Sequence, residues 1–316
     1  MTKVCKIYDV LIIGAGAAGL FLAANLRGKS VALLEKNTTP GKKILASGGG
    51  RCNVTNRRIA ASNYLGDANF VANILKNLSF QDVLKFFGKL KFNEQKQNQF
   101  FCESGSRTVL SVLLKKVEQS GAKIFYGMSV ASVRKILAGE NSEILDDSFA
   151  QDIKFDDSDG KNGTPISENF DTKKPQSGER NLSEIFEVVT ENGDKFYAET
   201  LVVASGGLSY KSLGASDIGY KIARDFGVAV APPAPALVGF TAQKDEFWFK
   251  NLSGVCFPAE ISVVCASKNA ANRELKMPRK FAGDILFTHK GISGPAVLNA
   301  SLFWQKGLIA INFCPN

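Results

Sequence analysis

Residues 9–19 read Asp9-Val10-Leu11-Ile12-Ile13-Gly14-Ala15-Gly16-Ala17-Ala18-Gly19, and they decide how the chain folds. The apolar run before Gly14 is typical of a strand buried on both faces of a parallel sheet. Residues 17–26 are rich in Ala and Leu, which indicates a helix. A second apolar run, residues 30–34, predicts the next strand and ends at Glu35. Strand, helix and strand in this order predict a βαβ unit.

The three glycines between the first strand and the helix suit a dinucleotide. Gly14 permits a tight turn, Gly16 lets the backbone approach a pyrophosphate, and Gly19 lets the helix pack against the sheet. The pyrophosphate would lie at the helix N-terminus, where N–H groups and the helix dipole favour negative charge. Glu35, 21 residues after Gly14, would accept hydrogen bonds from ribose hydroxyls, which disfavours NADP. The alternative is a Gly/Ala-rich packing helix without a ligand.

A second glycine-rich stretch follows directly. Three consecutive glycines, residues 48–50, lie between Lys42-Lys43 and Arg51-Cys52-Asn53. Backbone N–H groups without side chains can face a ligand there, and cationic side chains suit phosphates. Residues 37–58 lack periodicity, so we predict a loop that closes over the same dinucleotide; a basic flexible loop without a ligand is the alternative. Cys52 has no neighbouring cysteine, which favours a buried structural thiol over a redox thiol.

Two later segments also carry glycines. Residues 204–207, Ala204-Ser205-Gly206-Gly207, end a buried strand, and the strand ends of such a sheet face the ligand crevice. Residues 286–298 contain the single histidine, His289, and approach a G-x-S-x-G elbow but are one residue short, so a serine hydrolase is disfavoured. Thr288 and His289 either face a substrate cavity or form a structural turn, and the sequence leaves both open.

Composition excludes several classes of protein. The 316 residues are 45% hydrophobic and 22% charged, unlike collagen, coiled coils or wholly disordered chains. Six cysteines without C-x-x-C spacing and one histidine argue against a disulfide scaffold and a metal site. Residues 139–183 hold 11 acidic and 5 basic residues, so the remainder holds 34 basic against 19 acidic, a net charge of +15. Such a body attracts phosphates or nucleic acid, or is simply soluble.

The rest of the pattern predicts an α/β domain followed by a mostly β one. Further elements are expected as helices at 70–90, 106–120 and 218–226 and as strands at 123–126, 129–136, 185–190, 195–197 and 200–204. The acidic stretch 137–184 predicts a flexible insertion. We predict a dinucleotide-binding domain over 1–227 and a β-rich substrate domain over 228–316. No uninterrupted apolar run has membrane length, so we expect a cytoplasmic protein.

These segments together resemble the bacterial HI0933-like (YhiN-type) flavoproteins, described as NAD(P)/FAD-dependent oxidoreductases and aminoacetone-oxidase-family FAD enzymes. The runs that carry the resemblance are residues 12–19, 40–56, 204–210, 214–223, 235–238 and 287–298. The resemblance covers nearly the whole chain except the acidic stretch. Ser205 replaces a more common Thr, and Tyr210-Lys211 replaces a more usual Tyr/Met-Pro; neither change threatens the fold.

The resemblance implies FAD in a Rossmann-type domain of the two-dinucleotide-binding kind, with a barrel-like second domain. It implies an FAD-dependent oxidoreductase that acts on an undefined small molecule by hydride or electron transfer. No second G-x-G-x-x-G occurs, so either NAD(P)H visits the flavin transiently or the substrate itself is the hydride donor. Two alternatives stay open: an FAD-containing RNA-modifying or RNA-binding protein, and an inactive remnant. We expect no metal and no membrane partner, and we assign no catalytic residue.

The residues expected to bind FAD come from these glycine-rich segments, together with Val130 for a backbone contact with the adenine. They are Gly14, Gly16, Ala17, Ala18, Gly19, Glu35, Lys36, Lys43, Gly48, Gly49, Gly50, Arg51, Cys52, Asn53, Val130, Ala204, Ser205 and Gly206. Relatives continue beyond Asn316 with a segment that returns to the flavin. We therefore expect a fragment, or the product of an interrupted gene, that binds FAD weakly unless another chain supplies the missing part.

Overall fold

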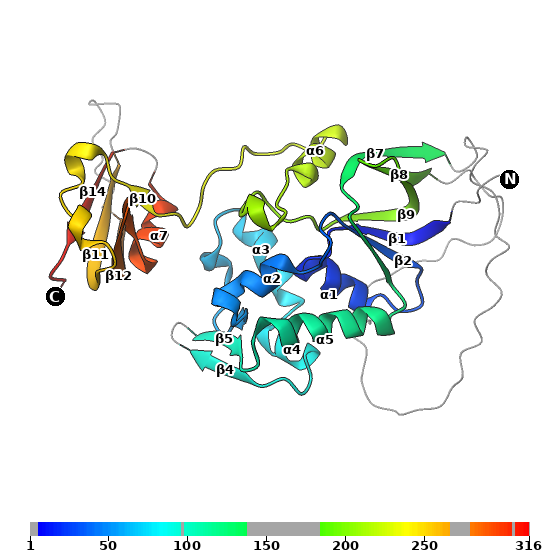
Figure 1. Cartoon of the computed structure of the whole chain (residues 1–316), viewed down its shortest axis with the longest axis horizontal. Coiled ribbons are helices and arrows are strands. Elements are labelled where there is room, and N and C mark those ends of the chain that lie inside the picture. The colour runs from blue at the N-terminus through cyan, green and yellow to red at the C-terminus, as the bar shows by residue number, and fades with distance from the viewer. Residues whose placement is uncertain (1–5, 96–97, 138–183, 266–278, 305–306, 316) are drawn as a thin grey trace. The chain divides into compact units, whose positions relative to one another are not determined.

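The structure, a computed structural model, describes every residue except 1–5, 96–97, 138–183, 266–278, 305–306 and 316 (Figure 1). The chain divides into two compact units, residues 1–230 and 231–316. Nearly all of the predicted acidic insertion lies outside the described residues. No helix within the described part is long and apolar enough to cross a membrane.

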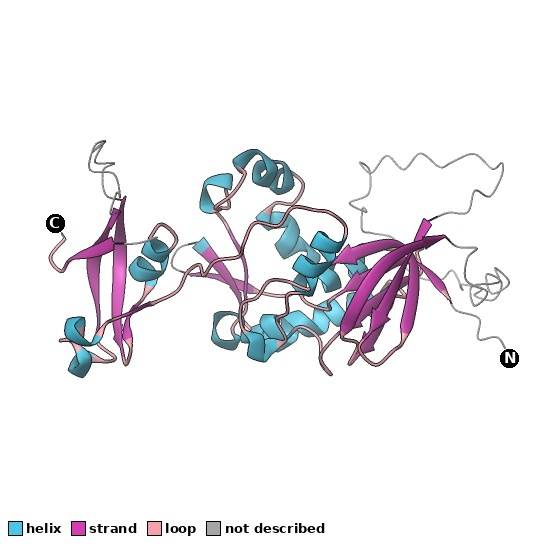
Figure 2. Cartoon of the chain, turned by 90° about the horizontal axis from the view of Figure 1, so that it is seen from above, coloured by secondary structure: helices cyan, strands magenta, loops and turns pink. Residues whose placement is uncertain are grey.

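A six-stranded mixed sheet, in the order β6-β2-β1-β9-β8-β7, forms the framework of the described first unit. Its strands are β1 (Ile7–Ile13), β2 (Val31–Glu35), β6 (Lys123–Tyr126), β7 (Val130–Leu137), β8 (Glu184–Thr190) and β9 (Lys195–Val203). β1 pairs in parallel with both β2 and β9, which explains why its apolar run is buried on both faces. Figure 2 shows these strands side by side. The predicted βαβ unit is confirmed.

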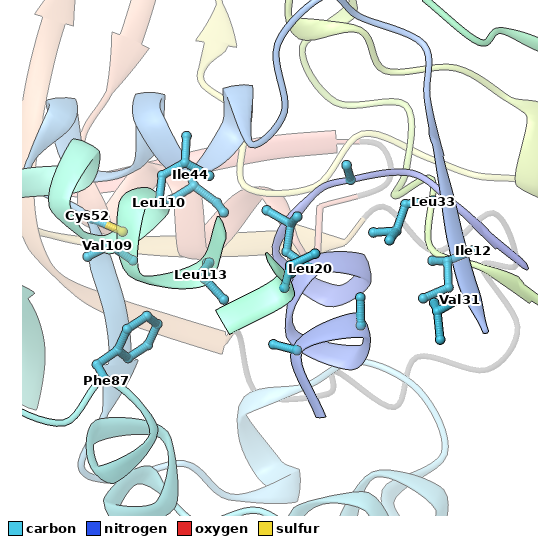
Figure 3. Close-up of a cluster of buried hydrophobic side chains, with 14 of the residues drawn as sticks. Ile12, Leu20, Val31, Leu33, Ile44, Cys52, Phe87, Val109, Leu110 and Leu113 are labelled. Carbon is cyan, nitrogen blue, oxygen red and sulfur yellow. The ribbon is translucent and has the colours of Figure 1, made fainter. Parts of the chain in front are cut away.

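Most helices of this unit bury apolar side chains against the sheet or against one another. The helices are α1 (Ala17–Asn25), α2 (Lys42–Ala46), α3 (Ala68–Lys76), α4 (Phe80–Phe86), α5 (Gly105–Gln119) and α6 (Ile218–Asp225). α5 buries Val109, Leu110, Leu113 and Val117, the helical spacing read from the sequence. Figure 3 shows this face of α5 in one cluster with Leu20 of α1 and side chains of β1 and β2. Burial of this surface contributes about 25 cal/mol per Å².

Two local predictions were wrong. Residues 37–58, predicted as a loop, contain α2, a 3-10 turn (Ser47–Gly50) and the strand β3 (Asn53–Asn56). β3 pairs with β5 (Gln99–Cys102), and β5 pairs with β4 (Phe92–Gln95), a small antiparallel sheet that periodicity did not reveal. The two strands predicted at 195–197 and 200–204 form one strand, β9. For β3 and β9, pairing with strands distant in sequence overrides the local pattern.

The second unit is mostly β, as predicted, with a five-stranded antiparallel sheet among its described residues. The order is β10-β13-β12-β11-β14. The strands are β10 (Phe240–Thr241), β11 (Cys256–Cys265), β12 (Arg279–Thr288), β13 (Gly291–Ser293) and β14 (Gly307–Asn312). A short helix, α7 (Pro295–Ser301), buries Ala296, Val297 and Ala300 in a cluster with Ile261 and Ile285 of the sheet.

Candidate functional site

A cavity of about 1170 Å³ lies in the first unit at the carboxyl ends of three parallel strands. Its wall contains Gly14 after β1, Glu35 at the end of β2 and Ala204 after β9. The carboxyl ends of parallel strands meet at one edge of a sheet, which is where open α/β folds bind ligands. The sequence therefore places its glycine turn, its acid and its Ala-Ser-Gly-Gly segment around one space.

The β1–α1 turn needs its three glycines for different reasons. A Cβ atom on Gly14, where φ is +106°, would lie 2.6 Å from the carbonyl oxygen of Ala204. A Cβ on Gly19 would lie 2.0 Å from the carbonyl oxygen of Gly14. At Gly16, apart from the glycine itself and its two chain neighbours, no described atom lies within 4 Å of the Cβ position. Gly14 and Gly19 are required by packing, whereas Gly16 leaves room for a ligand.

The N-terminus of α1 opens into this cavity. Gly16 is its N-cap, and no side chain of the described residues caps the first turn. Ala17 and Ala18 line the cavity, so the N–H groups of the first turn are placed to bind an anion. Lys36 and Lys43 lie in the same wall and supply positive charge. This arrangement fits a pyrophosphate.

The Glu35 carboxylate is buried, 7% exposed, in the cavity wall. Its Oε2 accepts a hydrogen bond from the Ala15 N–H at 3.0 Å. Its Oε1 accepts from the Asn37 backbone N–H at 2.8 Å and from Asn37 Nδ2 at 2.6 Å. Lys42 Nζ donates in turn to Asn37 Oδ1 at 2.9 Å. The network fixes the carboxylate beside the glycine turn, and Oε2, with one protein donor, retains acceptor capacity for a ribose hydroxyl.

The triple-glycine segment differs from this turn. Residues 48–50 have φ values of +57°, +67° and +88° and bend the chain ahead of β3, but none of them lines the cavity. Arg51 also lies outside the wall. Its Nε donates to the Gly48 carbonyl at 3.1 Å, its NH1 donates to Gln95 Oε1 at 3.1 Å, and its guanidinium stacks on Phe101. The side chain of Arg51 is therefore committed to the small β3–β5–β4 sheet.

The residues that follow this bend do line the cavity. Cys52 is buried, and burial together with the nearby Cys102 raises the pKa of its thiol to about 11. The thiol therefore stays neutral at physiological pH, as a structural cysteine does. Asn53 Oδ1 is buried and has no hydrogen-bond partner among the described residues. An unsatisfied buried acceptor costs about 1–3 kcal/mol, so a ligand N–H at this wall would be stabilising.

The segment after β9 completes the cavity. Ser205 and Gly206 lie in the wall, and Lys43 Nζ donates to the Gly207 carbonyl at 3.4 Å. α6 packs closely here, since a Cβ on Gly219 would lie 2.9 Å from Ser205 Oγ. The sequence analysis missed several wall residues in this part of the unit. They are Asn37, Met128, Ser129, Ala131, Glu191, residues 213–218 and Lys221. Residues 214–223 are one of the runs that carry the family resemblance, and this resemblance was the signal that could have predicted residues 214–218 and Lys221 as wall residues.

The cavity wall brings together most of the residues predicted to bind FAD. Those in the wall are Gly14, Gly16, Ala17, Ala18, Glu35, Lys36, Lys43, Cys52, Asn53, Val130, Ala204, Ser205 and Gly206. Those outside it are Gly19, Gly48, Gly49, Gly50 and Arg51. Their individual contacts with the cofactor stay predictions.

The segment around His289 forms a turn of the second unit. Thr288 Oγ1 donates to the Gly291 carbonyl at 3.0 Å, and His289 Nδ1 lies 2.9 Å from Ser253 Oγ. Thr288 thus closes a local turn, and His289 contacts a serine side chain rather than the backbone. Among the residues that the structure describes, no group of three or more His, Cys, Asp or Glu side chains could hold a metal ion.

Fold and site together define a Rossmann-type dinucleotide-binding protein with a mostly β second unit. The chain belongs to the HI0933-like family: the HI0933-like protein Rossmann domain matches residues 8–151, and the HI0933-like protein barrel and H2TH domain matches residues 234–316. FAD is the cofactor of this protein. The open Gly16, the uncapped α1 and the unpaired Asn53 Oδ1 fit such a molecule.

Curated relatives extend the comparison. The chain is 32% identical to the ribosomal RNA dihydrouridine synthases of Haemophilus influenzae and Escherichia coli, over 97% and 98% of its own length. It is 29% identical to the 3-dehydro-bile acid delta(4,6)-reductase of Clostridium scindens, over 94% of its length and 60% of that protein's. The chain spans 64% of the length of the first two relatives.

One solved structure illustrates a distant similarity in fold. The structure of Thermovibrio ammonificans THI4 aligns with 70% of this chain and 64% of that chain, at 14% identity and a TM-score of 0.38. A likeness at this level carries no functional argument.

Proposed function

We propose that this protein is an FAD-dependent reductase that saturates a carbon–carbon double bond conjugated with a carbonyl group. The carrying observation is the cofactor cavity, with open space at Gly16 and the Glu35 carboxylate held in its wall by hydrogen bonds. The names of the relatives supply the chemistry. Formation of dihydrouridine saturates the ring double bond of uracil, and a 3-dehydro-bile acid delta(4,6)-reductase saturates double bonds in conjugation with a ketone.

The chain's own residues bind and position the cofactor in this proposal. N–H groups at the start of α1 and the Lys43 ammonium hold the diphosphate, and Glu35 Oε2 accepts from the ribose. Asn53 Oδ1 accepts from a cofactor N–H. Apolar side chains of the wall, among them Phe21 and Phe87, exclude water. When bound, FAD supplies two-electron chemistry, with reduced nicotinamide as the transient electron donor.

Two substrate classes follow from different observations. A uridine in RNA is favoured by the two relatives that are 32% identical and by the net charge of +15 outside residues 139–183. A small conjugated ketone is favoured by the name of the bile acid reductase, and it is one kind of the undefined small molecule expected from the sequence. Both classes present the same bond: a C=C polarised by a neighbouring C=O.

Anaerobic reoxidation of the reduced protein tests the reaction. The FAD-loaded chain is reduced with NADPH, freed of excess reductant and mixed with uridine-containing RNA or a conjugated steroid ketone. We expect one substrate to reoxidise the flavin, with a mass gain of two hydrogens in the product. The matched controls are the same RNA with dihydrouridine in place of uridine and the saturated ketone, which lack the bond. No reoxidation by either substrate would contradict the proposed reaction.

A further inference from the structure

A second cavity, of about 400 Å³, lies beside the cofactor cavity, and Asn53 and Val54 line both. All of its wall comes from β3 and the loop that follows. The other wall residues are Thr55, Asn56, Arg58, Ile59, Asn63 and Tyr64. β3 is an edge strand of the described β3–β5–β4 sheet. We call this space the β3-edge cavity.

The side chains of the β3-edge cavity combine three kinds of chemistry. Tyr64 presents a ring that is 50% exposed, and Arg58 is exposed. Asn56 and Asn63 add side-chain amides, held in place because their Oδ1 atoms accept from the N–H groups of Arg58, at 3.0 Å, and Ala60, at 2.8 Å. An aromatic ring, a cation and amides are what proteins use to stack, anchor and read an unpaired base in RNA.

The charge beside this cavity is positive. Glu94 lies near enough to Arg58 to interact with it. However, Arg57 already forms a two-point ion pair with Glu94, with Nε to Oε1 at 2.8 Å, and stacks near Phe80 and Phe100. Arg57 therefore largely neutralises the charge of Glu94, and its side chain is held by contacts within the protein. Arg58 remains as the cationic side chain in the wall of the β3-edge cavity.

We propose that the β3-edge cavity binds a pyrimidine nucleotide of single-stranded RNA, with the base on Tyr64 and the phosphate on Arg58. The wall shared through Asn53 and Val54 places this nucleotide next to the cofactor cavity. The inference rests on the RNA form of the proposed function and names the residues that would hold that substrate. Binding is measured without turnover, so its failure and the failure of the reaction can be told apart.

The test is equilibrium binding of a fluorescent uridine-rich single-stranded RNA to the full FAD-loaded chain, with Arg58→Gln, Tyr64→Ala and Tyr64→Phe. Arg27→Gln is the matched control, because Arg27 is exposed just beyond the end of α1 that is remote from the cavities. We expect Arg58→Gln and Tyr64→Ala each to weaken binding about fivefold or more, and Tyr64→Phe to keep it, because stacking needs the ring and not the hydroxyl. The salt dependence of Arg58→Gln should also be shallower, by about 0.7 in log–log slope.

Several results would overturn the assignment. RNA binding that is absent in the wild type, or equal in Arg58→Gln, Tyr64→Ala and Arg27→Gln, would do so. If these variants raise the KM for a conjugated ketone and leave RNA binding unchanged, the β3-edge cavity binds a small molecule instead of RNA. Unchanged FAD content and melting temperature of each variant show that the cofactor cavity and the fold are intact. If RNA binds as expected but does not reoxidise the flavin, the subsite stands and the RNA form of the proposed reaction fails.

Discussion

The β1–α1 turn and the segment at residues 48–50 are both rich in glycine, but only the first lines the cofactor cavity. In the first, Gly16 faces open space in the wall. In the second, the glycines lie outside the wall, and a Cβ on Gly48 would lie 2.6 Å from the Phe101 ring. A run of glycines can thus serve two physical purposes. It can leave room for a ligand, or it can form a backbone bend that other residues rarely adopt. The neighbours of each glycine decide which applies.

The largest expected effect separates two glycines within the first turn. Gly14→Ala should lower the free energy of unfolding by about 3 kcal/mol, because φ is +106° and the methyl group meets a backbone carbonyl. Gly16→Ala should change stability by less than about 0.5 kcal/mol but weaken FAD binding at least tenfold, because its methyl group occupies the space of the diphosphate. Urea unfolding of the apoprotein and FAD titration measure the two quantities. Wild-type FAD affinity in Gly16→Ala would contradict the placement of the diphosphate.

A smaller effect is expected in the second segment. Gly49→Ala should cost about 1 kcal/mol of stability, because φ is +67° although the space around it is open. Gly48→Ala should cost more, because the Phe101 ring must also move. Neither variant should change FAD affinity. If Gly49→Ala loses FAD in the same titration, the backbone of this segment contacts the cofactor after all, as the sequence analysis predicted.

The smallest effect concerns Cys52, which follows the second segment. Its folded-state pKa of about 11 lies above the ordinary value of 9.0, so the neutral thiol is favoured by folding. Its contribution to stability is complete below pH 9 and is lost as the pH rises towards 11. The wild-type protein should therefore lose more free energy of unfolding than Cys52→Ala across this pH range. Tyr8 and Tyr126 are present in both proteins, so subtracting one stability-against-pH curve from the other removes their contribution. Parallel curves would show that Cys52 ionises normally.

Labelling gives a second measure of the same thiol. At pH 8 an alkylating reagent should modify the exposed Cys256 and Cys314 before Cys52. Rapid labelling of Cys52 in the folded protein would contradict its burial.

The sequence predicted the parts of the fold that depend on local pattern. The strand, turn and helix at residues 7–25 and the helix at 105–119 follow from apolar spacing and from glycine positions. It could not predict β4 and β5, because their stability comes from pairing with each other and, for β5, with β3 rather than from periodicity. The same limit applies to the site. Glu35 was visible from its spacing, whereas Asn37, which orients its carboxylate, became visible only in three dimensions.

The paired strands β7 and β8 place the two attachment points of the acidic stretch, Leu137 and Glu184, far from the cofactor cavity. Val130 and Glu191, at one end of the hairpin, line the cofactor cavity, whereas Leu137 and Glu184 pair at the other end. Seven residue steps of about 3.3 Å separate the ends by about 23 Å. The attachment points of residues 138–183 are thus remote from the chemistry. An affinity tag or fluorescent reporter grafted between Leu137 and Glu184 would leave the flavin pocket untouched, giving a handle for immobilising the protein during spectroscopy.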